Sequence, residues 1–175
     1  ISDAPLKTEG LIDWQNEKFD LSLDSKMLPL SLVSLVDVDL PTDLSASLNA
    51  HGQLSGDFTN PYYKGEISAR GNYKNLPFIS TVDVDGDLKT LKLNELRANL
   101  GEAKLQASGD IQIEQKILNI DIKEFSGSSQ LVKSFNIDVP DSLVLDLNIR
   151  EGYVSGPFNN PTYSGIANAN GYFQN

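Results

Sequence analysis

Apolar and polar side chains alternate with a period of two along much of this chain, and few folds are compatible with such a pattern. The alternation is strict in Ala103–Ile113, and it returns in Leu118–Ile122, in Leu143–Ile149 and, nearer the start, in Phe19–Leu23. A period of two places the apolar side chains on one side of a β-strand. The pattern therefore predicts antiparallel strands with one apolar face and one wet face.

Turn-forming residues recur between these runs, in places at intervals of roughly eight to twelve residues, as expected for a long meander of hairpins. The turn signals are Gly10, Gly52, Asn60-Pro61, Gly71, Asp85-Gly86 with Asp-Gly at a hairpin tip, Gly101 and Gly109. This spacing predicts about sixteen strands. Met27–Val36 and Gln130–Phe135 are apolar without clean alternation, and each is predicted to form a short helix or helical turn that plugs the apolar face.

The chain also repeats itself at a spacing of about 99 residues, which lengthens to about 100 beyond Arg150. A repeat of whole supersecondary units implies an elongated stack in which each unit covers the open edge of its neighbour. We expect one repetitive domain over residues 1–175, excised from a longer protein. Residues 1–9 would end a preceding repeat, 10–108 would form one full repeat, and 109–175 would form part of a second.

A long sheet with one apolar face must pack on a second sheet, close into a barrel or curl into a trough. A barrel closes at a fixed number of strands, so repeated units would not extend it, whereas a trough can lengthen indefinitely. The expected fold is all-β: an elongated, curled antiparallel sheet that forms an open hydrophobic groove, with one short helical turn per repeat. The alternative is a β-sandwich with a sealed core, as in an adhesin-like binding or structural surface module.

The residues with the strictest alternation are the expected lining of this groove, where they would contact apolar cargo. They are Leu21, Leu23, Leu105, Ile111, Ile113, Leu118, Ile120, Ile122, Leu143, Leu145 and Leu147.

The composition argues against several other classes of function. The chain has 14 Lys and Arg against 24 Asp and Glu, so its formal charge is −10 and no basic stripe could neutralise nucleic-acid phosphates. It has no cysteine, which excludes disulfides and thiolate metal sites, and its one histidine is His51. Asp83, Asp85 and Asp87 do not have the spacing of a calcium loop. No nucleophile elbow or phosphate loop occurs, so we expect no enzyme activity, no metal and no cofactor.

Two further patterns carry a resemblance to a known family. One is Gly52-x-Leu54-Ser55-Gly56-x-Phe58-x-Asn60-Pro61-x-Tyr63-x-Gly65 with its copy at Gly152–Gly165, and the other is the Leu-Pro-Leu-Ser-Leu segment at Leu28–Leu32. Together with Gly86–Gly109, these motifs resemble the TamB family, an AsmA-like group similar to bridge-like lipid transfer proteins.

The resemblance implies a β-groove (β-taco) in the periplasm of a Gram-negative bacterium, within a long protein anchored in the inner membrane. The expected partner of such a protein is an outer-membrane barrel of the TamA type, reached through parts outside this chain. The expected cargo is phospholipid, moved between the inner and outer membranes, or unfolded outer-membrane β-barrel and autotransporter segments during translocation and assembly.

Overall fold

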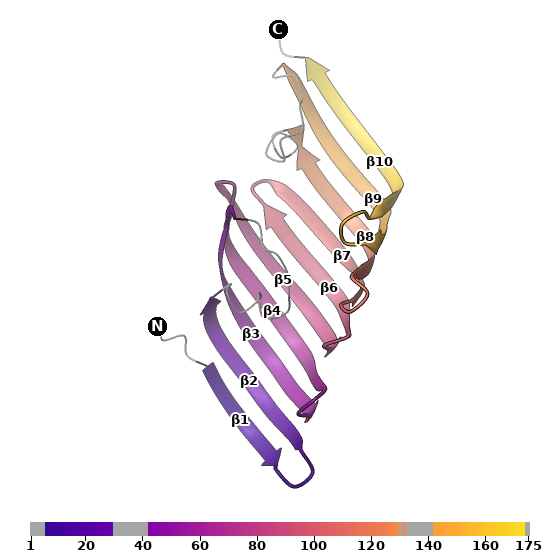
Figure 1. The fold of residues 1–175 in the computed structure, drawn as a ribbon. Helices are drawn as coiled ribbons and strands as arrows, with labels where there is room; N and C mark the ends of the chain where they lie inside the picture. The colour runs from indigo at the N-terminus through magenta and orange to yellow at the C-terminus, as the bar shows by residue number, and fades with distance from the viewer. Residues whose placement is uncertain (1–5, 30–41, 130, 132–141, 174–175) are drawn as a thin grey trace.

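The protein folds into a single antiparallel sheet in which every strand pairs with the strands before and after it in sequence (Figure 1). The computed structural model describes residues 6–29, 42–129, 131 and 142–173. The ten strands are β1 (Leu6–Asp13), β2 (Lys18–Pro29), β3 (Leu44–Asp57), β4 (Pro61–Tyr73), β5 (Leu76–Asp87), β6 (Thr90–Leu100), β7 (Ala103–Gln112), β8 (Ile117–Ser128), β9 (Leu143–Pro157) and β10 (Thr162–Phe173).

The expected antiparallel meander is confirmed, but the strand count of about sixteen is wrong. The strands are longer than expected because most of the glycines that we interpreted as turns lie inside strands. Gly10, Gly52, Gly71 and Gly109 are strand residues, whereas Asn60 and Gly101 do lie in turns. Ten strands at a spacing of about 4.8 Å give the sheet a length of about 43 Å across the strands.

The expected hairpin tip at Asp85-Gly86 is also wrong. Both residues belong to β5, and the turn follows at Leu88 and Lys89. The carboxylate of Asp87 closes this turn by accepting hydrogen bonds from the backbone N–H groups of Lys89 and Thr90, each at 2.8 Å. An Asp that bonds the backbone two and three residues ahead stabilises a turn whether or not glycine follows it.

The helix expected over Met27–Val36 does not begin at Met27. Met27 and Pro29 are part of β2, and the backbone N–H of Met27 donates to Asn49 Oδ1 at 3.0 Å. Met27 has φ 58°, so the strand is bulged here rather than wound into a helix. The rest of that segment lies outside the described residues, and of Gln130–Phe135 only Leu131 is described.

The expected curl is wrong: the sheet is open and uncurled, with β1 and β10 at its opposite ends (Figure 1). The extensive contacts of each strand are with its neighbours in the sheet, so the described strands form one layer and not a sandwich. One-sided alternation requires the apolar face to be covered, but it does not require the strands themselves to bend. β3, β4 and β5 pair in unbroken register along their whole lengths, and such strands bend sharply only at a bulge.

The register aligns the apolar residues into rows that run across the strands, because directly paired residues point to the same side of a sheet. We call one of these rows the central row; it crosses eight strands and consists of Ser25, Ala50, Ile67, Val82, Leu96, Ala107, Ile122 and Gly152. Ser25 is 1% exposed, Ala50 8% and Ala107 0%, so several of the most buried residues of the sheet lie in this row, and Val84, at 3%, lies in the next one.

Candidate functional site: a continuous apolar face

Most of the expected groove residues share one side of the sheet, which we call the apolar face. Leu21 pairs with Leu54, Ile111 with Leu118, and further rows continue the face to the last strand. The residues that lie on it within strands are Leu21, Leu23, Leu105, Ile111, Leu118, Ile120, Ile122, Leu143, Leu145 and Leu147. Ile113 lies just beyond the end of β7, where its backbone N–H donates to Lys89 O at 2.8 Å.

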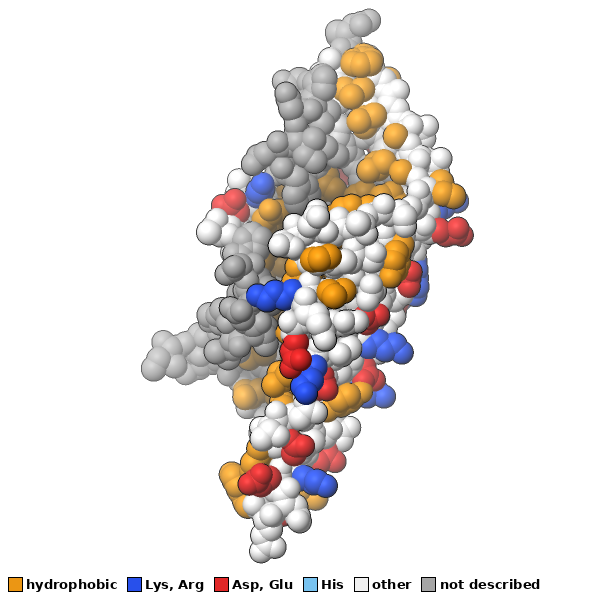
Figure 2. Space-filling model, turned by 45° about the vertical axis from the view of Figure 1, so that its right-hand side comes forward, with side chains coloured by type: hydrophobic (Ala, Val, Ile, Leu, Met, Phe, Trp, Pro, Cys, Tyr) orange, Lys and Arg blue, Asp and Glu red, His pale blue; other side chains and the backbone are white. Residues whose placement is uncertain are grey.

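These residues, Ile113 included, are half-buried, neither sealed nor fully open to solvent. The most exposed large side chains of the apolar face lie on the two edge strands. They are Leu6 at 56% and Ile12 at 46% on β1, and Tyr163 at 74% and Phe173 at 68% on β10. Figure 2 shows hydrophobic side chains at the surface over the last strands, with charged side chains gathered lower in the view.

Sequence reasoning missed much of this face in β3–β6. Leu54, Val84, Leu91, Leu93 and Leu96 share it by direct pairing across strands. Their pattern is obscured in the sequence because glycine and serine interrupt the apolar positions and because β6 contains an extra residue. These residues are identified by the pairing register between strands, which the sequence of a single strand does not reveal.

Tyr63 extends the apolar face across a gap in it. Gly52 and Gly65 pair directly and leave no side chain there, and a Cβ on either would lie within about 3 Å of the Tyr63 hydroxyl. That hydroxyl lies 3.1 Å from both His51 O and Glu66 O, to which it can donate. Desolvation by burial raises the pKa of Tyr63. An aromatic side chain over paired glycines restores the packing that the glycines lack.

The opposite side of the sheet is polar and is linked from strand to strand by side-chain hydrogen bonds. Gln53 donates to Asp20 at 2.6 Å, Asn119 donates to Asp110 at 3.0 Å, and Tyr153 donates to Asn119 at 3.2 Å. A sheet with one hydrogen-bonded wet face and one apolar face has a single side that an apolar ligand can occupy.

The aspartates that we examined as calcium ligands lie on or next to this polar face. Asp85 accepts a hydrogen bond from the Tyr62 hydroxyl and lies 4.0 Å from the ammonium of Lys64. In the parts of the chain that the structure describes, no group of three or more His, Asp or Glu residues is placed to hold a metal ion.

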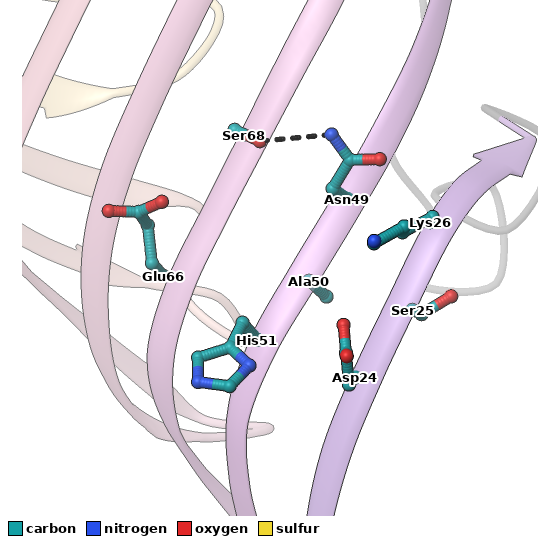
Figure 3. Close-up of a pocket in the computed structure, with 8 residues that line it drawn as sticks. All are labelled: Asp24, Ser25, Lys26, Asn49, Ala50, His51, Glu66 and Ser68. Atoms are coloured by element: carbon teal, nitrogen blue, oxygen red, sulfur yellow. Dashed lines mark hydrogen bonds between the residues drawn. The ribbon is translucent and has the colours of Figure 1, made fainter. Parts of the chain in front are cut away.

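His51 lines a shallow depression of about 240 Å³ beside the bulge of β2 (Figure 3). Its direct cross-strand partners are Asp24 and Glu66, so the imidazole lies between two carboxylates on the polar face. A hydrogen bond of 3.3 Å from Asn49 Nδ2 to Ser68 Oγ closes one side of the depression. Exposed polar groups of this kind are typical of a solvated sheet surface.

An aromatic cluster borders the apolar face at the β1–β2 and β3–β4 turns. The ring of Phe58 lies 5.4 Å from that of Trp14, edge to face, and 5.9 Å from that of Phe19, stacked. Trp14, the one tryptophan of the chain, is 74% exposed. The tyrosines beside the two Asn-Pro turns, Tyr62, Tyr63 and Tyr163, are aromatic residues that the sequence alone would place at such a rim. Tyr163 lies on the apolar face of the edge strand, whereas Tyr62 lies on the polar face.

Aspartate carboxylates stabilise the turns at the edge of the sheet where the aromatic cluster lies. The side chain of Asp57 accepts hydrogen bonds from the Thr59 hydroxyl at 2.7 Å and from the backbone N–H of Asn60 at 2.7 Å, and these bonds lower its pKa. Asp13 and Asp87 close their own turns in the same way and also have lowered pKa values. These carboxylates stabilise turns, and the apolar face is the candidate site.

Comparison with family models, with curated proteins and with solved structures found no match. Within the described residues, no helix has the length and apolar character needed to cross a membrane.

Proposed function

We propose that this chain is a non-enzymatic segment of a hydrophobic conduit that carries phospholipid acyl chains along its apolar face. The observation that supports it most is the register, which aligns apolar residues of neighbouring strands on one side of the sheet, from β1 to β10. Weak apolar contact at every step suits movement of cargo, because burial of apolar surface has no directional requirement.

The half-buried state of the apolar face favours transport over simple structural packing. Ile120, for example, pairs with Gly109 and Val154, so its side chain is flanked by a glycine on one side and by a small residue on the other. Ile120 itself is half-buried. About 25 cal/mol of free energy is gained for each Å² of apolar surface covered, so cargo on this face is stabilised without any polar partner.

The repeat belongs to the same proposal: units of about 99 residues extend the sheet. Two backbone features recur at equivalent positions and support the repeat. Glu17 and Lys116 both have φ 54°. The carbonyl of Glu17 accepts a hydrogen bond from the N–H of Phe58 at 3.1 Å, and the carbonyl of Lys116 accepts one from the N–H of Phe158 at 2.9 Å. The first bond connects the β1–β2 turn to the β3–β4 turn, and the second connects the β7–β8 turn to the β9–β10 turn.

On the basis of its TamB-like motifs, we propose that this conduit lies in the periplasm, between the two membranes of a Gram-negative cell. A TamA-type barrel would be its outer-membrane partner. Unfolded outer-membrane protein would be an alternative cargo for the same face.

Adjacent residues on opposite faces provide the test. Ile120 points to the apolar face and is half-buried, whereas Asp121 points to the polar face and is exposed. A photoreactive benzoylphenylalanine at position 120 should crosslink phospholipid after incubation with phospholipid vesicles, and the same group at position 121 should not. Equal crosslinking from both positions, or none from position 120, would refute the proposal.

Charge substitutions extend this test to transfer itself. Ile120→Arg and Leu145→Arg should abolish movement of labelled phospholipid between donor and acceptor vesicles while the protein stays soluble and β-rich by circular dichroism, because a buried guanidinium opposes an acyl chain. Asp121→Arg is the matched control and should transfer at the wild-type rate.

A further inference from the structure

The bulges of the sheet lie along one line. β6 carries an extra residue, Asn94, two residues before Leu96 of the central row, and β8 carries Lys123 next to Ile122. β9 is bulged at Glu151, next to Gly152, and β2 at Met27, two residues after Ser25. Each irregularity therefore lies within two residues of the central row, although the strands run in alternating directions.

The extra residues belong to the polar side of the sheet. Asn94 lines a depression there with Lys92, Ser108 and Asp121, and Lys123, Glu151 and Met27 are exposed. Glu95, the neighbour of Asn94, accepts hydrogen bonds from Gln106 Nε2 at 2.9 Å and from Arg97 Nε at 3.0 Å. An insertion on one face lengthens that face, so the strand bends with the lengthened face convex. Bending at these positions would therefore make the apolar face the concave one.

The backbone at two of these positions is in a conformation that residues other than glycine rarely adopt. Met27 and Glu151 both have φ 58°, in the left-handed region. Such conformations persist in a folded protein where the surroundings impose them, and they concentrate at positions that bend or switch.

We propose that this line of bulges is a crease about which the sheet bends, so that the uncurled sheet closes its apolar face around an acyl chain. The inference rests on the proposed function for the identity of the cargo. The extra residues lie on β6, β8 and β9, and again on β2, while β3, β4 and β5 pair with one another without a break. We therefore expect β3–β5 to stay rigid while the bulged strands bend.

The same geometry supplies a matched pair of probes. Lys92 and Asn99 on β6 span the crease, and Lys64 and Arg70 on β4 occupy the same two rows of the polar face in a strand without a bulge. All of them are exposed, and the chain has no cysteine, so paired cysteines can carry spin labels without background labelling. The separations are about 20 Å, within reach of double electron–electron resonance.

Without ligand, the distance distribution of the 92–99 pair should be broader than that of the 64–70 pair. Equal widths would overturn the crease. A variant that lacks Asn94 restores the plain alternation of β6, and in it the 92–99 distribution should narrow to the width of the control pair. If this variant does not fold, the comparison of the two pairs in the otherwise unaltered chain still decides.

With dihexanoylphosphatidylcholine added below its micellar concentration, the 92–99 distance should lengthen by a few ångströms, because labels on the convex face diverge as the strand bends. The 64–70 distance should not change. A shift of both pairs, or of neither while native mass spectrometry shows bound lipid, would overturn the crease. If no lipid binds, the conduit proposal fails. The crease is then tested by the widths of the 92–99 and 64–70 distance distributions measured without ligand.

Discussion

Gly109→Ala should destabilise the protein more than the same substitution at Gly10. Both glycines have φ 154°, and a Cβ on either would overlap a backbone carbonyl oxygen of the next strand, Asn119 O for Gly109 and Asp20 O for Gly10. The two sites differ in one respect: β7 is paired on both sides, whereas β1 is the edge strand and can move away from the clash.

The magnitude follows from the backbone. A non-glycine residue held in a glycine-only region costs about 1–3 kcal/mol, and Gly109→Ala adds displacement of β8 to that cost. With a urea dependence of about 2 kcal/mol per M, a loss of about 2 kcal/mol lowers the unfolding midpoint by about 1 M. Gly10→Ala should lower it by less than half as much.

Urea titration followed by circular dichroism measures both variants, with Ser108→Ala on the polar face as the control expected to change stability by less than about 0.5 kcal/mol. A Gly109→Ala variant with the midpoint of the unaltered chain, or Gly10 and Gly109 variants with equal losses, would refute the reasoning that the paired neighbour strand makes these glycines necessary.

Three further predictions concern packing, hydrogen bonding and pH. Val84→Ala should cost about 1–3 kcal/mol in urea unfolding because Val84 is 3% exposed, whereas Val154→Ala at a half-buried position should cost less. Tyr63→Phe should cost about 0.5–1.5 kcal/mol by the same measurement, since it removes the hydroxyl that bonds backbone carbonyl groups. Asp57→Ala should lower the unfolding midpoint more at about pH 7 than at about pH 2. The pKa of Asp57 is lowered in the folded state, so its carboxylate contributes stability above its ordinary pKa, and this stability is lost as the pH falls through the folded-state pKa. An equal loss at both pH values would contradict this.

Alternation along single strands was enough to assign the all-β class and the side on which Leu118, Ile120 and Ile122 lie. Successive side chains of a strand point to opposite faces, so the sequence of one strand is enough to assign its residues to two faces. The same reasoning failed at Gly52 and Gly71, which look like turns in the sequence. Glycine marks a turn and a close approach of two backbones equally well, and only the neighbouring strand distinguishes them.

From the sequence alone came the one-sided pattern, and with it the requirement that something apolar cover one face. The tertiary structure decided the number of strands, the register that joins Leu54, Tyr63 and Leu91 to that face, and the absence of curl among the described strands. The physical reason is that pairing and bending depend on contacts between strands. A bulge such as that at Asn94 is defined only by the residues opposite it.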